Sequence, residues 1–415
     1  MIFISKGGNL CQLAIQPQTG YTDNSNDQGG VRLNSIKPLG LYIHIPFCRQ
    51  KCVYCDFYSL AGNEGRMDEY TETLCAHLAE NASAAAGHTV DTVYFGGGTP
   101  SYLGGRRLSQ ILGTIFQHYS VSDSAEITLE ANPDSAGDPI SLKKLRSAGF
   151  NRISLGMQSA CAEELADIGR IHTPEQVEAA VAAARAAGFD NLSLDLIYGL
   201  PHQTLERWKE NLSAAVALNP EHLSCYGLKV EEGTPLYVRR ETAELPGDEA
   251  QSDMYLHTVE FLSRHGYAQY EISNFSRPGR ESRHNLKYWI LGEYLGFGPG
   301  AHSDFGGIRF AYERDLATYL QGIRNHTPVF SEREEIPPSE RCAEWLMLRL
   351  RTVRGVDPNE FESRFQHSFA AFLPFLNQCQ QAGYAVFEEG CWHLTPQGFL
   401  LSNQIIGTLL DQLER

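Results

Sequence analysis

Short apolar runs alternate along the first half of the chain with stretches whose apolar residues recur at helical spacing. We expect strands at residues 41–45, 92–95, 126–130, 152–155, 191–197 and 222–226. The intervening residues 67–86, 108–118, 141–148, 174–187 and 204–218 have patterns typical of helices. Because strands that alternate with helices form parallel sheets with right-handed crossovers, the sequence predicts an α/β core, a partial barrel of six β/α units.

Three other segments flank or follow this core, which we assign to residues 38–235. Residues 1–37 are polar and rich in turn formers, so we expect a flexible N-terminal tail. Residues 236–335 are rich in Tyr, Gly and Arg, and we interpret them as an extension that covers the open side of the barrel. Residues 336–415 contain two amphipathic helices, a hairpin and a last helix capped by Thr395 and Pro396, which is typical of a small winged-helix-like α+β domain.

Conspicuous polar and small residues follow the predicted strands directly. Cysteines 48, 52 and 55 come after the first strand, and a run of three glycines and a threonine, 96–99, comes after the second. Later strands end near Glu130, Gln158 and Asp195. Because ligands bind at the carboxyl ends of parallel strands, we expect these residues to share one site.

The composition narrows the classes of function. The chain has 34 Lys and Arg against 50 Asp and Glu, a net charge of -16, which argues against nucleic acid as the main partner. The last helix also lacks the dense basic set of a DNA-reading helix, so we expect the C-terminal domain to pack or to bind a protein partner. No apolar run approaches twenty residues and no leader precedes the core, so we expect a cytoplasmic protein without a transmembrane segment, for which peripheral membrane contact stays open.

Of the ten cysteines, only Cys48, Cys52 and Cys55 have the spacing of metal ligands. Thiolates select zinc, copper(I) or iron–sulfur clusters. A zinc site would need a distant cysteine or His44 as its fourth ligand. An iron–sulfur cluster on three thiolates would leave one iron open to another ligand.

The C-x3-C-x2-C spacing after the first strand, together with Gly-Gly-Gly-Thr-Pro after the second, resembles the radical S-adenosylmethionine (SAM) enzymes. The resemblance implies that Cys48, Cys52 and Cys55 hold a 4Fe-4S cluster, whose open iron takes the amino and carboxylate groups of SAM. A zinc site would account for the thiols but not for the glycines. Within the superfamily, residues 38 to the C-terminus most resemble the branch of the oxygen-independent coproporphyrinogen III oxidases and the HemW heme chaperones. In that branch the SAM contacts correspond by spacing to Tyr42, Tyr54, Gly97, Gly98, Thr99, Glu130, Gln158, Arg170 and Asp195.

Two features separate the groups of this branch. The oxidases have a further cysteine two residues past the third ligand, where this chain has Phe57. The segment from His284 to Trp289 resembles the HNxxYW signature of the HemW group. Imidazole is a common axial ligand of heme iron, so His284 is the candidate heme ligand, with Tyr288 and Trp289 as apolar surface. A hydrogen-bonded structural histidine is the alternative, in which case Cys225, His302 or another residue becomes the ligand to seek.

The resemblance therefore implies a heme chaperone that carries a 4Fe-4S cluster and SAM, binds heme and transfers it to acceptor hemoproteins. It assigns no catalytic residue to the chain itself. The alternatives are a coproporphyrinogen III oxidase of porphyrin metabolism and a SAM-dependent enzyme that acts on another substrate.

Overall fold

The computed structural model describes residues 37–413, so the predicted N-terminal tail lies outside the described residues except for Lys37. The core is a 12-stranded sheet whose six central strands are parallel and adjacent in chain order. These strands are β1 (Lys37–Ile45), β4 (His88–Gly97), β5 (Val121–Ala131), β6 (Arg152–Gln158), β7 (Leu192–Tyr198) and β8 (His222–Gly227). The α/β class and the six predicted parallel strands are confirmed.

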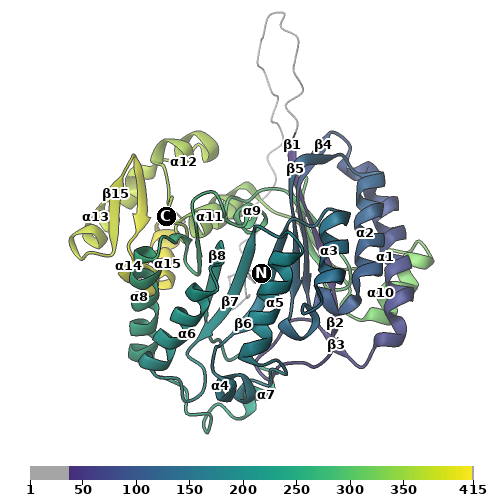
Figure 1. Cartoon of the computed structure of the whole chain (residues 1–415). Coiled ribbons are helices and arrows are strands. Elements are labelled where there is room, and N and C mark those ends of the chain that lie inside the picture. The colour runs from purple at the N-terminus through teal and green to yellow at the C-terminus, as the bar shows by residue number, and fades with distance from the viewer. Residues whose placement is uncertain (1–36, 414–415) are drawn as a thin grey trace, which may run out of the picture.

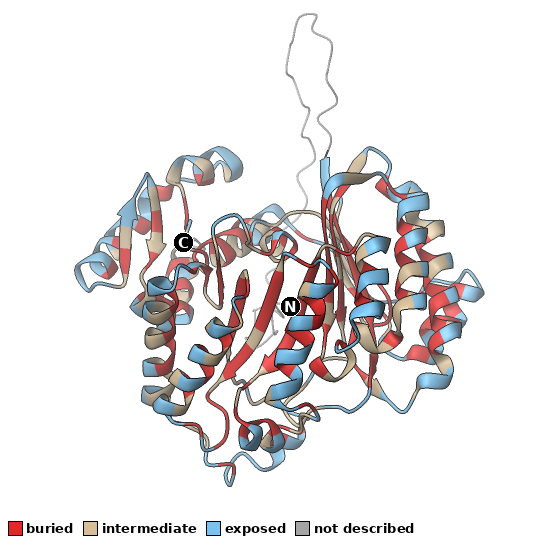
Figure 2. Ribbon diagram, viewed as in Figure 1, coloured by how far each residue is buried: buried red, intermediate tan, exposed pale blue. Residues whose placement is uncertain are grey.

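Helices connect these strands along the outer face of the sheet (Figure 1). They are α1 (Met67–Asn81), α2 (Gly105–His118), α3 (Pro139–Ala148), α5 (Pro174–Ala186) and α6 (Leu205–Ala217), with a short α4 (Ala162–Asp167) that was not predicted. Figure 2 shows their buried faces turned to the sheet and their exposed faces turned to solvent. Helix α5 illustrates how the sequence sets a boundary, because Thr173 and Gln176 form a capping box around Pro174.

The segment after residue 235 extends both edges of this sheet. At one edge, β10 (Asn274–Ser276) pairs antiparallel with β8 and with β9 (Ala268–Glu271). At the other edge, β11 (Tyr294–Phe297) pairs in parallel with β1, followed by the antiparallel strands β12 (His302–Phe305), β13 (Ile308–Tyr312) and β14 (Phe330–Glu335). The helices of this segment are α7 (Pro235–Val238), α8 (Asp248–Arg264), α9 (Arg283–Trp289) and α10 (Leu316–Arg324).

The C-terminal residues form a second hydrophobic core at the opposite end of the molecule from α1 and α2 (Figure 1). Three helices precede the hairpin where the sequence predicted two: α11 (Pro338–Arg349), α12 (Pro358–Phe365) and α13 (Leu373–Gln381). The predicted hairpin is β15 (Ala385–Glu388) and β16 (Cys391–Leu394). Thr395 caps the next helix as predicted, but the chain then breaks at Leu401 into α14 (Pro396–Leu400) and α15 (Ser402–Leu413).

Glu271, at the end of β9, lies where the C-terminal residues meet the sheet, and it is 1% exposed. Its carboxylate accepts hydrogen bonds from the Ser273 N–H at 2.9 Å and from the Asn274 amide. Burial nevertheless raises the pKa of Glu271 to about 7. The folded chain therefore holds this proton more tightly than the unfolded chain does. The resulting contribution to the free energy of unfolding is complete below the unfolded pKa and is lost as pH rises through about 7.

We therefore expect Glu271→Gln to become more stable relative to the wild type as the pH rises. The gain in free energy of unfolding should be small near pH 4.5 and reach roughly 3 kcal/mol above pH 7.5. Urea denaturation between pH 5 and 8 measures this difference. Glu178→Gln, at an exposed site on α5, serves as the control. Parallel pH profiles for the wild type and Glu271→Gln would contradict the prediction.

Candidate functional site

The three predicted cysteine ligands lie in the loop that follows β1. The short strands β2 (Phe47–Cys48) and β3 (Leu60–Ala61) pair in parallel and close the base of this loop. Cys48 is buried, whereas Cys52 and Cys55 are half-buried. The loop thus holds three thiols at the carboxyl end of the sheet, where the sequence predicted the site.

The glycine loop after β4 packs directly on the cysteine loop. The Gly98 N–H donates to the Ile45 carbonyl and the Thr99 N–H to the Phe47 carbonyl, both at 2.8 Å. A Cβ on Gly98 would lie 2.8 Å from the Phe47 oxygen and 3.0 Å from the Cys48 Sγ. Glycine is therefore required at position 98 because protein atoms of the cysteine loop occupy the space of a side chain.

A chain of polar contacts joins Cys48 to Cys52. The Thr99 Oγ1 lies 3.4 Å from the Cys48 Sγ and accepts a hydrogen bond from the Asn132 Nδ2 at 3.1 Å. The Asn132 Oδ1 accepts from the Arg170 Nη2 at 2.8 Å, and the Arg170 Nη1 donates to the Cys52 Sγ at 3.5 Å. The Thr99 hydroxyl and the Arg170 guanidinium are thus placed beside two of the three candidate ligand sulfurs, where such outer partners orient metal ligands.

Asn132 is a residue of this site that the sequence reasoning missed. It lies just past the end of β5, two residues after Glu130, at the same edge of the sheet as the predicted residues. Its position at a strand end was the available signal.

The cysteine loop fits an iron–sulfur cluster better than a single metal ion. Burial raises the pKa of Cys48, and it raises that of Cys55 to about 11, so the thiolate forms of these two cysteines need a bound cation. Among residues 37–413, no group of three or more His, Cys, Asp or Glu side chains is arranged to hold a metal ion. A 4Fe-4S cluster offers a different iron to each cysteine, so its ligands need not meet at one point. His44, the alternative zinc ligand, uses its ring nitrogens in hydrogen bonds with the Tyr42 hydroxyl and the Tyr58 carbonyl.

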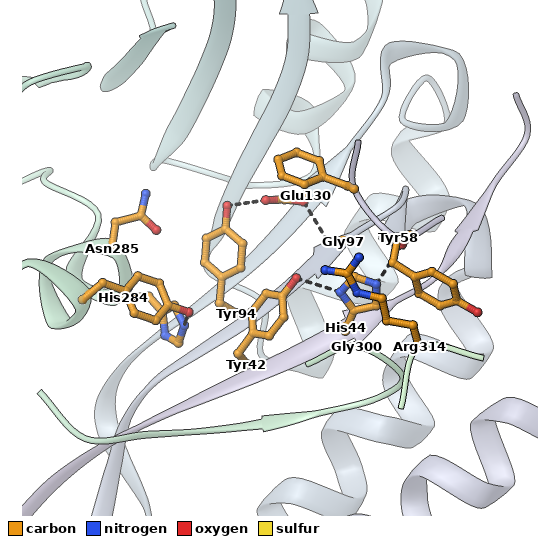
Figure 3. A pocket seen from close by; sticks show the side chains of 12 residues that line it. Tyr42, His44, Tyr58, Tyr94, Gly97, Glu130, His284, Asn285, Gly300 and Arg314 are labelled. Atoms are coloured by element: carbon orange, nitrogen blue, oxygen red, sulfur yellow. Dashed lines mark hydrogen bonds between the residues drawn. The ribbon is translucent and has the colours of Figure 1, made fainter. Parts of the chain in front are cut away.

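A pocket of about 590 Å³, including its open mouth, lies beside the two loops (Figure 3). Strands β1, β4 and β5, the cysteine loop and helix α9 contribute its walls. The lining residues are Tyr42, His44, Phe57, Tyr58, Tyr94, Gly97, Glu130, His284, Asn285, Tyr288, Gly300 and Arg314. The pocket thus brings together four of the predicted site residues: Tyr42, Gly97, Glu130 and His284.

The two candidate ribose-binding carboxylates are already hydrogen-bonded by neighbours. Glu130 accepts from the Tyr94 hydroxyl at 2.6 Å and from the Gly97 N–H at 3.2 Å (Figure 3). Asp195 accepts from the Ser154 hydroxyl at 3.1 Å, among others. Burial raises the pKa of both carboxyls, and the charge of Asp195 raises that of Glu130 further. Glu130 lines the pocket, whereas Asp195 lies outside its lining.

The remaining predicted contacts lie around the pocket rather than in its lining. Tyr54 packs against a small apolar group that includes Ile168 and Ile197. Gln158 ends β6 in the left-handed region, with φ of 62°. Tyr54 lies within the cysteine loop itself, and Gln158 lies at the carboxyl end of the sheet.

His284, the candidate heme ligand, is 1% exposed and uses both ring nitrogens in hydrogen bonds. Its Nδ1 lies 2.9 Å from the Thr92 Oγ1, and its Nε2 lies 2.9 Å from the Tyr288 hydroxyl. Burial lowers the pKa of His284 to about 3, so the ring is neutral. It stacks on Tyr94, with ring centroids 5.2 Å apart. To ligate a heme iron, His284 Nε2 would have to give up its hydrogen bond with the Tyr288 hydroxyl.

The other residues considered for heme are placed differently. Trp289 and Cys225 are buried and do not line the pocket. His302 begins β12, also outside the lining. Tyr288 lines the pocket.

We expect Asn132→Ala to loosen the cluster, because it removes the group that orients both Thr99 and Arg170. Loss of such an outer partner should speed removal of iron by a chelator about tenfold. The decay of the visible absorbance of the reconstituted protein measures this rate. Asn81→Ala, which removes a half-buried amide on α1 bonded to the His77 carbonyl, is the matched control. Equal rates for Asn132→Ala and the wild type would contradict the role of Asn132.

Comparisons with known proteins match the chain to radical SAM proteins of the HemN and HemW type. The family model of the Radical SAM superfamily matches residues 42–215, and that of the HemN C-terminal domain matches residues 336–401. The chain is 35% identical to the heme chaperone HemW of Bacillus subtilis (strain 168), over 90% of this chain and 99% of the relative. It is 36% identical to the heme chaperone HemW of Escherichia coli (strain K12), over 91% and 99%.

A solved structure agrees with these relatives. The coproporphyrinogen III oxidase HemN of Escherichia coli, described as a radical SAM enzyme, superimposes with a TM-score of 0.79 at 26% identity and 91% coverage of both chains. None of the helices in residues 37–413 is long and apolar enough to span a membrane.

Proposed function

The chain belongs to the HemW family of the radical SAM superfamily, and from that premise we propose that it binds heme and transfers it to acceptor hemoproteins. The observation that carries the proposal is the full-length match to relatives named heme chaperones, at 34–36% identity for those from Bacillus, Mycobacterium, Escherichia and Haemophilus. These matches span about nine-tenths of this chain and almost the whole length of the relatives from Bacillus and Escherichia.

The proposed cofactors are a 4Fe-4S cluster on Cys48, Cys52 and Cys55 and a SAM molecule beside it. When bound, this pair supplies one-electron chemistry. The chain's part is to hold the thiolates through Thr99 and Arg170 and to offer polar groups to SAM. Those groups are the predicted contacts on β1, in the cysteine and glycine loops, near the ends of β5 and β6 and on β7, together with Arg170.

The proposed heme site is the pocket. Tyr94, Tyr288 and Phe57 present flat apolar surface, which suits a porphyrin macrocycle. His284 is the proposed iron ligand, through Nε2. The cysteines in the described part of the chain are all free, which supports a reducing cytoplasm as the place of work.

One alternative rests on a specific observation, the similarity to the HemN structure. A coproporphyrinogen III oxidase must position propionate side chains for hydrogen abstraction and loss of carbon dioxide. The oxidases have a further cysteine two residues past the third ligand. This chain has Phe57 at that position, and Phe57 lines the pocket. This replacement favours the chaperone.

Two assays on the reconstituted full-length protein decide between these functions. Heme-loaded protein mixed with apomyoglobin should transfer its heme, seen as the appearance of the myoglobin Soret band. The reduced protein incubated anaerobically with SAM and coproporphyrinogen III should form no protoporphyrinogen IX. Robust protoporphyrinogen formation would overturn the chaperone in favour of the oxidase. A protein that neither binds heme nor forms protoporphyrinogen would instead be a SAM-dependent enzyme with another substrate.

A further inference from the structure

The pocket has one strongly basic residue. Of the 12 side chains that line it, only Arg314 is a lysine or arginine, and only Glu130 is a carboxylate. Both Glu130 oxygens already accept hydrogen bonds from protein groups. His44 and His284 already use both of their ring nitrogens in hydrogen bonds with protein groups. The positive charge available to a ligand in this pocket is therefore that of Arg314.

The backbone on both sides of Arg314 is fixed by the loops of the site. The Gly300 N–H donates to the Glu313 carbonyl at 3.1 Å, and the Leu316 N–H donates to the Tyr58 hydroxyl at 3.1 Å. The stem of Arg314 packs on Gly300, where a Cβ would lie 3.3 Å from the Arg314 Cγ. The glycine-rich loop before β12 and the cysteine loop together hold this arginine at the pocket.

The guanidinium of Arg314 is available for a ligand. It extends over His44 into the pocket (Figure 3), and its charge helps burial to lower the pKa of that histidine. None of the ion pairs formed among residues 37–413 involves Arg314. The neighbouring Asp315 carboxylate instead caps α10 through the Thr318 N–H at 2.8 Å.

We propose that Arg314 is the carboxylate-binding residue of this pocket and that it pairs with a propionate of the bound heme. The inference rests on the proposed function, and it names the group by which the pocket holds an otherwise flat, apolar ligand. A guanidinium offers two parallel N–H donors that match a carboxylate. Aromatic walls and one cation at the rim suit a macrocycle whose polar groups are side-chain carboxylates.

The test uses hemin and hemin dimethyl ester, which lacks free carboxylates, as probes of the reconstituted full-length protein. Arg314→Gln should weaken hemin binding about tenfold, as expected when one charge-assisted pair is lost, and leave the ester unaffected. Arg314→Lys should recover part of the affinity for hemin. Arg333→Gln, at an exposed arginine on β14, is the matched control and should bind both probes as the wild type does. Circular dichroism shows whether each variant is folded.

Every other outcome counts against the inference. Equal weakening of hemin and its ester in folded Arg314→Gln would show that the residue shapes the pocket without binding a propionate. Weaker SAM binding with unchanged hemin binding would assign Arg314 to the carboxylate of SAM. Unchanged binding of all three ligands would leave Arg314 without a carboxylate partner. If the wild type binds neither porphyrin, the proposed function fails first and the propionate assignment falls with it.

Discussion

Replacing Cys48, Cys52 or Cys55 with alanine should abolish the visible absorbance of the reconstituted iron–sulfur cluster. Each of the three is expected to ligate a different iron, and no spare cysteine lies in the same loop to take its place. The loss should therefore be complete for each single variant. Absorbance near the thiolate-to-iron transitions, together with the iron content per chain, measures it.

Two cysteines in other elements serve as controls for this experiment. Cys75 lies on α1, and Cys161 precedes α4, where its Sγ contacts the Arg207 guanidinium. Alanine at either position should leave the cluster intact. If Cys75→Ala or Cys161→Ala removed the absorbance as fully as Cys48→Ala, the ligand assignment would be wrong.

His284→Ala should shift the Soret band of the heme-loaded protein and weaken heme binding by at least about tenfold, or roughly 1.4 kcal/mol. The expectation follows if Nε2 leaves the Tyr288 hydroxyl to ligate the iron. Tyr288→Phe then becomes informative, because it removes the hydrogen bond that competes with ligation but keeps the aromatic wall. Tyr288→Phe should bind heme at least as tightly as the wild type.

A matched control separates ligation from a general loss of packing. His77 is also buried and also bonded to a tyrosine hydroxyl, that of Tyr319 at 2.8 Å, but it lies on α1, away from the pocket lining. His77→Ala should leave the heme spectrum unchanged. A folded His284→Ala with wild-type spectrum and affinity would return His284 to a structural role. The search for the iron ligand would then move to His302 and Cys225.

The sequence could predict the framework of the site because that framework follows from local patterns. The alternation of apolar runs with helical stretches predicts parallel strands. Because the carboxyl ends of parallel strands lie at one edge of the sheet, the residues that follow them lie close together. The cysteine and glycine loops follow β1 and β4, and two backbone hydrogen bonds join them. Their contact was therefore predictable from strand order alone.

Other contacts join residues too distant in sequence for any local pattern to show. The Glu126 carboxylate on β5 accepts hydrogen bonds from the N–H groups of Arg283 and His284, both at 3.1 Å, and so ties α9 to the sheet. The link from Thr99 through Asn132 to Arg170 likewise spans three loops. Such pairings depend on how loops close in three dimensions, which a single sequence does not encode locally.

In the C-terminal residues, the sequence did not predict where each helix begins and ends. The sequence predicted the hairpin and the Thr395 cap correctly but counted two helices where there are three. Gln366, in the left-handed conformation, ends α12, and a 3-10 turn at Phe369–Phe372 precedes α13. Nothing in the apolar spacing alone separates these short helices, because packing of Phe361 and Phe372 into one core sets the break.

Titration of hemin into the reconstituted full-length protein, followed by the Soret absorbance, tests the proposed heme function most directly. We expect saturable binding at one heme per chain, with a spectrum distinct from that of free hemin. The His284→Ala variant should bind hemin with lower affinity. A titration that never saturates and keeps the spectrum of free hemin would contradict heme binding, and with it the chaperone function proposed for this chain.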